Sequence, residues 1–388
     1  MLLQVLYAVR AIDLTSATKN VSTVSGTGEP GSTDGDDALV DGASAVAVGA
    51  VGDLLFTEDG TSKIRRVLFG PPLPLPPVAP PPPPTPPLSP SHPPSAPSPP
   101  SPPLSYPQVQ TLFCVQCGGS AIDPNGIPFP GDIQGIVSVG NGDLLWASGD
   151  TLQRYNWATN QLAVIAGNLA SSGDQDGLTS LLNGPTGLFW ERAADVVYFT
   201  DTGNNKIKKI NLTTNAVDTV AGSGEFGMAD GSLLASQFVT PFFIVATDKE
   251  CLYLTERFHN RLRKLNFTSN AVSTIYVNFV PFALEYDAHN QTLFMSTDSR
   301  TQVYAMDVVT EQLTLVAGLP FYSQRTIMDG PGLTASFEGC FGLALNGTTL
   351  YVADEYAIRS IELDSPQKNV STVAGESEAH RWGVKSQA

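Results

Sequence analysis

The stretch VVYFTDTGNNKIKKINLTTNAVDTVAGSG, from Val196 to Gly224, decides the fold. Apolar and polar residues alternate in three short runs, and Asp, Gly, Asn and Thr residues of the kind that favour turns separate these runs. The pattern predicts three β-strands joined by tight turns. An apolar run, PTGLFW from Pro185, precedes them and predicts one further strand. The unit is therefore expected to be a four-stranded sheet.

This unit recurs along the chain. Its second strand carries a large apolar residue in one column of the aligned copies: Leu55, Leu145, Tyr198, Tyr253, Phe294 and Tyr351. The intervals are 90, 53, 55, 41 and 57 residues, and the first becomes 53 when the 37 residues of a proline-rich run, 71–107, are set aside. A four-stranded sheet has two apolar faces and buries them only against neighbouring sheets. The sequence thus predicts an all-β fold, a β-propeller of four-stranded blades.

Two similar stretches near the ends bear on the number of blades. YAVRAIDLTSATKNVSTVSG from Tyr7 and YAIRSIELDSPQKNVSTVAG from Tyr356 agree at 13 of 20 positions, and each reads as the third and fourth strands of a blade. Six full repeats follow the N-terminal partial one. We expect a single propeller over 1–388, interrupted by 71–107 and followed by a disordered tail at 376–388. Six blades are favoured, and the alternative is a seventh, incomplete blade in a chain that is part of a longer protein.

The copy from Tyr198 to Gly231 resembles an NHL repeat, and the other copies are looser versions of it. The resemblance covers nearly all of the chain except 71–107. It implies the propeller fold and leaves the function open, because NHL propellers serve many roles.

The proline-rich run 71–107 holds 21 of the 31 prolines. Proline lacks an N–H and fixes φ, so the run favours an extended polyproline II segment inserted between the third and fourth strands of one blade. Its Ser-Pro pattern resembles the hydroxyproline-rich modules of plant and volvocine algal matrix glycoproteins, which implies hydroxylated and glycosylated prolines. A plain low-complexity insert, or a ligand for a proline-recognising domain, is the alternative.

Six Asn-x-Ser/Thr sequons are glycosylation candidates: Asn20, Asn211, Asn266, Asn290, Asn346 and Asn369. Duplication of one turn within the repeat explains part of their number. With the proline-rich run they favour an extracellular or cell-wall location. The N-terminus has no basic leader and no clear cleavage site, and no apolar run reaches the ~18–20 residues that cross a bilayer.

Few residues of the sequence suggest a redox, metal-binding or catalytic role. Cys114 and Cys117 form a CVQC pair, which we interpret as a local disulfide or two inert thiols. Asp201, Asn204 and Asn205 suggest a metal-binding loop, but such residues commonly bond to nearby backbone in turns, and the structural interpretation is favoured. The Asp-Gly pairs of the inter-blade loops have the same explanation.

Glu285 is the one charged residue inside a predicted inner strand, rather than at its end. Lactonase-like propellers hold a divalent cation there with several Asp, Glu and Asn side chains. Amidating-lyase-like propellers use several histidines on zinc, whereas this chain has His92, His259, His289 and His380. We therefore expect no catalytic residue, no metal and no cofactor.

Phe226, Phe258 and Phe321 lie on predicted loops and are candidates for a binding rim or for a cap on the core. A net charge of −16 argues against binding to nucleic acid, since that requires clustered Lys and Arg. The favoured function is a non-catalytic interaction propeller that binds protein or glycan through its loops. A propeller hydrolase or lyase and an RNA-binding NHL propeller are the alternatives.

Overall fold

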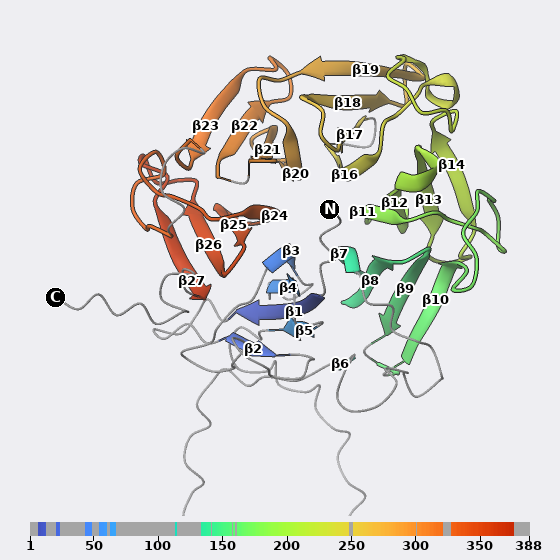
Figure 1. The fold of residues 1–388 in the computed structure, drawn as a ribbon, viewed down its shortest axis with the longest axis horizontal. Coiled ribbons are helices and arrows are strands. Elements are labelled where there is room, and N and C mark those ends of the chain that lie inside the picture. The colour runs from blue at the N-terminus through green and yellow to red at the C-terminus, as the bar shows by residue number, and fades with distance from the viewer. Residues whose placement is uncertain are drawn as a thin grey trace, which may run out of the picture.

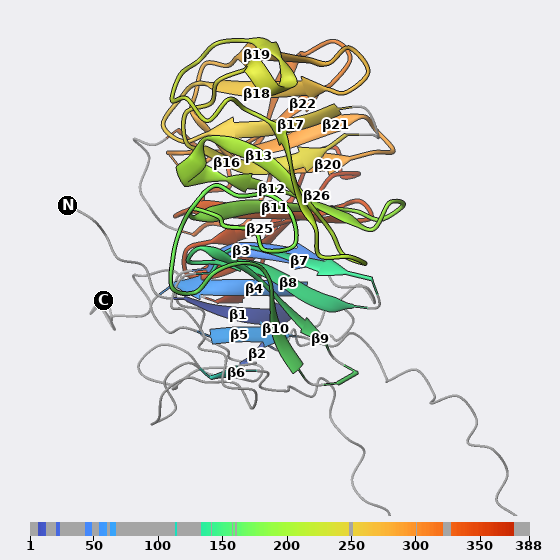
Figure 2. The same ribbon diagram turned by 90° about the vertical axis from the view of Figure 1, so that its right-hand side faces the viewer.

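The structure is a computed structural model that describes residues 7–12, 21–23, 43–48, 54–59, 63–66, 113–114, 133–140, 142–156, 158–159, 161–247, 251–299, 301–320 and 327–375. The proline-rich run 71–107 and the predicted tail 376–388 lie outside these residues. The described strands form six sheets around a common centre (Figure 1). Seen from the side, the strands run across the thickness of the ring (Figure 2).

Five of these sheets are built around the predicted four-stranded unit. The first contains β7 (Ile133–Val139), β8 (Asp143–Ser148), β9 (Thr151–Asn156) and β10 (Gln161–Gly167). The second contains β11 (Pro185–Glu191), β12 (Val196–Asp201), β13 (Lys206–Asn211) and β14 (Val217–Ala221), with a 3-10 turn, η1 (Thr202–Asn204), between its second and third strands. Successive strands pair antiparallel in chain order, as the alternating pattern predicts.

The remaining three blades follow the same order. They contain β16 (Pro241–Ala246), β17 (Cys251–Glu256), β18 (Arg261–Asn266) and β19 (Ala271–Tyr276); β20 (Pro281–Asp287), β21 (Thr292–Thr297), β22 (Val303–Asp307) and β23 (Leu313–Ala317); and β24 (Cys340–Asn346), β25 (Thr349–Asp354), β26 (Ala357–Glu362) and β27 (Val370–Gly375). A two-residue strand, β15 (Gly231–Ser232), adds to the outside of β19, and a 3-10 turn, η2 (Leu233–Ala235), follows it.

The N-terminal sheet departs from the prediction. It has six strands: β1 (Tyr7–Ile12), β2 (Val21–Thr23), β3 (Ala43–Val48), β4 (Leu54–Asp59), β5 (Lys63–Arg66) and β6 (Phe113–Cys114). Both β1 and β5 pair antiparallel with the same part of β4, residues 56–58. The reason lies in the repeat, because β1 and β5 are both copies of a third strand and both suit a position beside β4. Among the described strands, five blades therefore have the predicted four-stranded meander, and the expectation of six or seven such blades was wrong.

The innermost strands form a closed ring. In order around the centre, each strand contacts the next: β3, β7, β11, β16, β20, β24 and again β3. At Gly187 in β11 the two neighbouring backbones approach so closely that an added Cβ would lie 2.2 Å from the Phe242 carbonyl oxygen of β16. Only glycine fits at such a contact.

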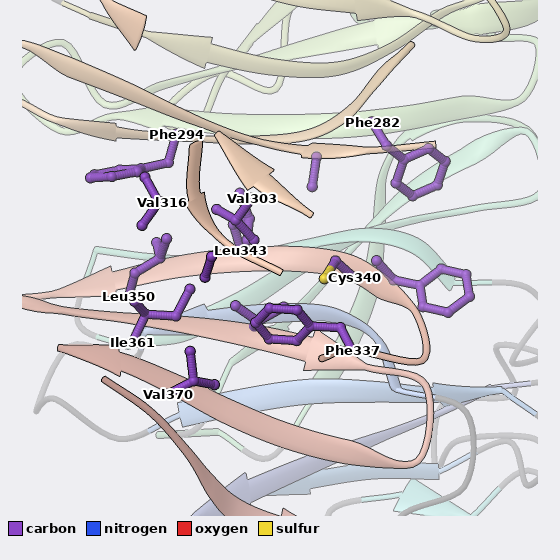
Figure 3. Packing of buried hydrophobic residues seen from close by; sticks show 14 of the residues in the cluster. Phe282, Phe294, Val303, Val316, Phe337, Cys340, Leu343, Leu350, Ile361 and Val370 are labelled. Carbon is purple, nitrogen blue, oxygen red and sulfur yellow. The ribbon is translucent and has the colours of Figure 1, made fainter. Parts of the chain in front are cut away.

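Apolar side chains fill the spaces between blades. The cluster between the last two blades contains residues of both, and Figure 3 shows among them Phe294, Val316, Leu350 and Ile361. Full burial of one such side chain stabilises the fold by about 1.5–3 kcal/mol. Because each blade covers the face of its neighbour, the blades depend on one another for stability.

Buried hydroxyl groups also join neighbouring blades. Thr200 Oγ1 accepts a hydrogen bond from the Gly187 N–H (2.9 Å) in its own blade and donates to the Phe242 carbonyl (2.8 Å) in the next. Thr255 Oγ1 does the same between the Phe243 N–H and the Phe282 carbonyl, at 3.1 and 3.0 Å. The hydroxyl residue at the fifth position of the second strand thus links adjacent inner strands.

Candidate functional site: two faces and a central cavity

The turns of the ring gather on two opposite faces. One, which we call the long-loop face, contains the starts of the inner strands and the turns 202–205 and 257–260. Thr202 Oγ1 donates to the Pro241 carbonyl at 2.6 Å, and the Thr240 N–H donates to Asn205 Oδ1 at 3.1 Å, so a turn of one blade lies beside the start of the next inner strand. Because consecutive hairpins alternate ends, the remaining turns lie on the other, short-turn face. There the Leu212 N–H, for example, donates to the Asp195 carbonyl at 3.1 Å.

A buried cation of the third strand joins several acidic groups in the β11–β14 blade. Lys208 Nζ lies 2.7 Å from Asp174, 3.1 Å from Asp176 and 3.4 Å from Asp201. Burial raises the pKa of Asp201, although the Asn183 N–H and Lys208 oppose this. For Lys208, burial acts to lower the pKa but is outweighed by the three carboxylates, so the pKa is raised and the ammonium group is retained.

Two further blades repeat this network with arginine. Arg263 lies 3.3 Å from Glu256 and 3.0 Å from Asp230, and Arg359 lies 3.0 Å from Asp354 and 2.8 Å from Asp329. The acid supplied by the linking loop is in each case the Asp of an Asp-Gly pair. Its carboxylate also accepts from a fourth-strand threonine: Thr219, Thr274 or Thr372. Each network therefore ties a linking loop to the second, third and fourth strands of its blade.

Asp201, Asn204 and Asn205, which suggested a metal site, are engaged by protein groups. Asn204 Nδ2 donates to the Gly173 carbonyl (2.7 Å) and to Asp201 Oδ2 (2.8 Å). Within the described part of the chain, no three His, Cys, Asp or Glu side chains are grouped so as to hold a metal ion. The loop thus acts in the structure as a turn that anchors its neighbours.

The predicted binding rim is located on the long-loop face. Phe258 in the turn 257–260 is 68% exposed, and Phe226 on the preceding linking loop is 69% exposed. Met228 belongs with them, since it is 60% exposed and its sulfur contacts Arg261 Nη1 at the start of β18. The guanidinium of Arg257 lies 5.1 Å from the centre of the Phe258 ring and 5.0 Å from that of the buried Phe242. Phe226, Met228, Arg257 and Phe258 are here named the aromatic rim, while Phe321 lies outside the described residues.

The described sequons lie on the short-turn face. Asn211 and Asn266 are the last residues of third strands and Asn346 is the last residue of a first strand, whereas Asn290 and Asn369 lie in the turns that follow such strands. Asn290 and Asn346 are exposed, and the others are partly exposed. Asn20 lies outside the described residues. The sequence did not show this sidedness, which follows from the alternation of hairpin ends.

The remaining candidates do not converge. Cys114 ends β6, and Cys117 lies outside the described residues, so their predicted disulfide stays a prediction. His259 is in a turn of the long-loop face and His289 in a turn of the short-turn face. His92 and His380 lie outside the described residues. The two described histidines are therefore on opposite faces.

A cavity of about 250 Å³ lies among the inner strands. Its wall includes Phe189, Phe243, Val245 and Glu285. The Glu285 side chain is half-buried in this wall, and its partial removal from solvent raises the pKa of its carboxyl to about 8; the Tyr286 N–H opposes the shift. At neutral pH this carboxyl is mainly protonated.

Comparison with known proteins agrees with the observed fold. No protein-family model matches the sequence. NHL repeat-containing protein 2 of Homo sapiens is 25% identical over 217 residues, which cover 53% of this chain and 29% of the human protein. The protein SUPPRESSOR OF QUENCHING 1, chloroplastic, of Arabidopsis thaliana is 31% identical over 110 residues, which cover 28% of this chain and 10% of the plant protein. This chain thus corresponds to less than a third of either relative.

Among solved structures, virginiamycin B lyase from Staphylococcus aureus is similar over 94% of this chain and 88% of the lyase, with 10% identity and a TM-score of 0.47. The sheet arrangement and the similarity to NHL repeat-containing proteins are the two observations that support the following assignment. The chain is an all-β propeller with four-stranded blades, and it is related at modest identity to NHL repeat-containing proteins.

Proposed function

We propose that this chain is a non-catalytic interaction module, outside the cell or in the cell wall, that binds a protein or a glycan through the aromatic rim. The observation that carries the proposal is Phe258. Its φ is +67°, a conformation that is a rare outlier for a bulky side chain. Such strain costs about 1–3 kcal/mol and is concentrated at functional sites.

The chemistry of the aromatic rim suits recognition. Aromatic and Arg side chains dominate the binding energy of protein interfaces, whereas isolated exposed apolar residues need no explanation. Here the exposed Phe258 ring lies beside the Arg257 guanidinium, and the exposed Phe226 and Met228 lie on the linking loop that leads into β16. Arg257 stacks on both Phe242 and Phe258, which holds the exposed ring over the buried core. A net charge of −16 disfavours RNA as the partner.

The distribution of the sequons supports the long-loop face as the contact surface. If the chain is secreted, glycans attached to the five described sequons would project from the short-turn face. The aromatic rim would then stay free of glycans. The location itself is a proposal that rests on the sequons and on the proline-rich run 71–107; separately, no helix within the described residues is long and apolar enough to cross a membrane.

The location is tested by mass spectrometry of the protein from its native source. We expect glycans on Asn290 and Asn346, the most accessible described sequons, and hydroxyproline within 71–107. Unmodified peptides at all of these positions would remove the argument for an extracellular location.

Binding is tested by retention of the purified chain on matrix proteins and glycans from the same source. The double variant Phe226→Ser/Phe258→Ser is expected to bind at least tenfold more weakly. The matched control is Val309→Ser, because Val309 is 72% exposed on the short-turn face. Protease or glycosidase treatment of the matrix distinguishes a protein partner from a glycan. Equal loss of retention in the two variants, or none in either, would contradict the proposal.

A further inference from the structure

Glu285 occupies a position that is apolar in the other five inner strands. In the sheet, Glu285 pairs with Phe294 of the neighbouring second strand. The equivalent residues of the other inner strands pair with the large apolar residues that align with Phe294 in the repeat: Leu55, Leu145, Tyr198, Tyr253 and Tyr351. Those equivalents, Ala47, Val137, Phe189, Val245 and Ala344, all line the central cavity. These six equivalent positions are therefore apolar in five of the described inner strands and carry a carboxyl group only at Glu285.

The surroundings of Glu285 bring it no compensating charge. Among the described residues that line the cavity, Glu285 is the sole ionisable one. Strands β16 and β21, which pack against β20, contain no ionisable residue; β17 contributes Cys251, Tyr253 and Glu256, and β24 contributes Cys340, none of which lines the cavity. Within the described part of the chain, the carboxyl therefore lies in an apolar site that supplies no cation.

The cavity has room and polar edges for a small ligand. Its volume of about 250 Å³ corresponds to about eight water molecules at about 30 Å³ each. Each inner strand of the five regular blades pairs on one side only, so its other edge, with backbone N–H and C=O groups, lies toward the centre (Figure 1). Phe189, Phe243 and Leu284 supply apolar wall.

We propose that the central cavity binds a small primary alkylammonium ion, with the ammonium group on the Glu285 carboxylate and the alkyl chain against the apolar wall. The ammonium has three N–H donors, one for the carboxylate and two for carbonyl groups of the strand edges. Aromatic rings add cation–π attraction. A divalent metal is a poorer match, because Ca²⁺ takes six to eight oxygen ligands, several of them carboxylates, and this wall has a single carboxyl group.

Binding and proton release are coupled in this site. Because its surroundings raise the pKa of Glu285 to about 8, the carboxyl is mainly protonated at pH 7. The ammonium binds the ionised form, so close to one proton should leave per ligand bound at pH 7, and almost none well above pH 8. This site is separate from the aromatic rim and does not depend on the function proposed for that rim.

The test is calorimetric titration of the full chain with n-butylammonium chloride at pH 7, in two buffers of different ionisation enthalpy. We expect one site, a heat that differs between buffers by nearly one proton per ligand, and at least tenfold weaker binding by Glu285→Gln. The control is Glu225→Gln, an exposed acid on a linking loop, which should bind like the parent. Undetectable binding up to millimolar concentrations, binding unchanged in Glu285→Gln, or binding without proton release would each overturn the proposal.

A second measurement checks that Glu285→Gln folds and that the carboxyl is buried. A carboxyl whose pKa is raised in the folded state stabilises the protein below its unfolded pKa, and this stability is lost as the pH rises to the folded pKa. The denaturation midpoint of the parent should therefore fall between about pH 4.5 and about pH 8 relative to that of Glu285→Gln. A parallel pH profile in the two proteins would contradict the burial on which the proposal rests.

Discussion

The turns 202–205 and 257–260 occupy the same place in neighbouring blades and have the same length, yet they differ in what they do. In 202–205, Asn204 and Asn205 bond to Gly173, Asp201 and Thr240, and the left-handed residue is Asn205, with φ +52°. In 257–260, the left-handed residue is Phe258, and its side chain is exposed. Asparagine tolerates this conformation and phenylalanine does not.

The difference shows how a repeat can carry function at one copy without weakening the ring. Below both turns lies the same framework, a buried cation of the third strand paired with acids of the second strand and of the linking loop. That framework holds the blade, so the turn above it is free to vary. Three predictions test this division between framework and turn.

The largest effect is expected from the shared framework. Lys208→Met and Arg359→Met each leave a buried carboxylate, Asp201 or Asp354, without its cation. Breaking a buried pair in this way costs about 3–5 kcal/mol, and we expect similar losses in the two blades by chemical denaturation. Lys209→Met is the control, since the Lys209–Asp218 pair at 3.7 Å is exposed and an exposed pair contributes about 0–1 kcal/mol. A loss below about 1 kcal/mol in the buried variants would show that these networks do not hold the blades.

A smaller effect is expected within the turns. Asn204→Ala removes the donors to Gly173 and Asp201, which should lower the free energy of unfolding by about 1–3 kcal/mol. His259 occupies the aligned position of the other turn, where its Nδ1 contacts the Arg257 carbonyl at 2.8 Å on the surface. His259→Ala should change stability by less than about 0.5 kcal/mol. Equal losses would mean that both turns are structural.

The smallest effect is expected at Phe258, where substitution should increase the free energy of unfolding instead of lowering it. Phe258→Gly relieves the left-handed strain of about 1–3 kcal/mol and adds unfolded-state entropy worth about 0.5–1 kcal/mol, so stability should rise by about 1 kcal/mol. Val309→Gly, at an exposed position without positive φ, should lower it instead. A clear loss of stability in Phe258→Gly would indicate that the ring is part of the core.

The strands and their order were predictable, because each strand repeats a local pattern. The ion-pair partners of the buried cations were not predictable, because these partners are distant in the sequence. Nothing beside Lys208, Arg263 or Arg359 in the sequence identifies its acidic partner, because the Asp-Gly pairs that bind these cations lie about 30 residues upstream. A signal was present, because the three cations occupy nearly the same place in the repeat and each follows an Asp-Gly pair.

The first sheet and Glu285 show two further limits. The N-terminal copy and the copy at β5 are both third strands, so the repeat alone could not tell which one pairs with β4. Glu285 was identified as the one charge inside an inner strand, but its place in the wall of a central cavity depends on the closed ring and not on the residues beside it. The sidedness of the sequons likewise follows from how hairpins alternate between faces.

The most direct test of the aromatic rim uses a photo-reactive phenylalanine analogue at one position at a time. It is placed at 258 on the long-loop face or at 309 on the short-turn face, and the protein is irradiated in extracellular material from its native source. The account predicts a discrete cross-linked partner, a protein or a glycan, from position 258 and none from position 309. The same partner from both positions, or a partner from position 309 alone, would contradict it.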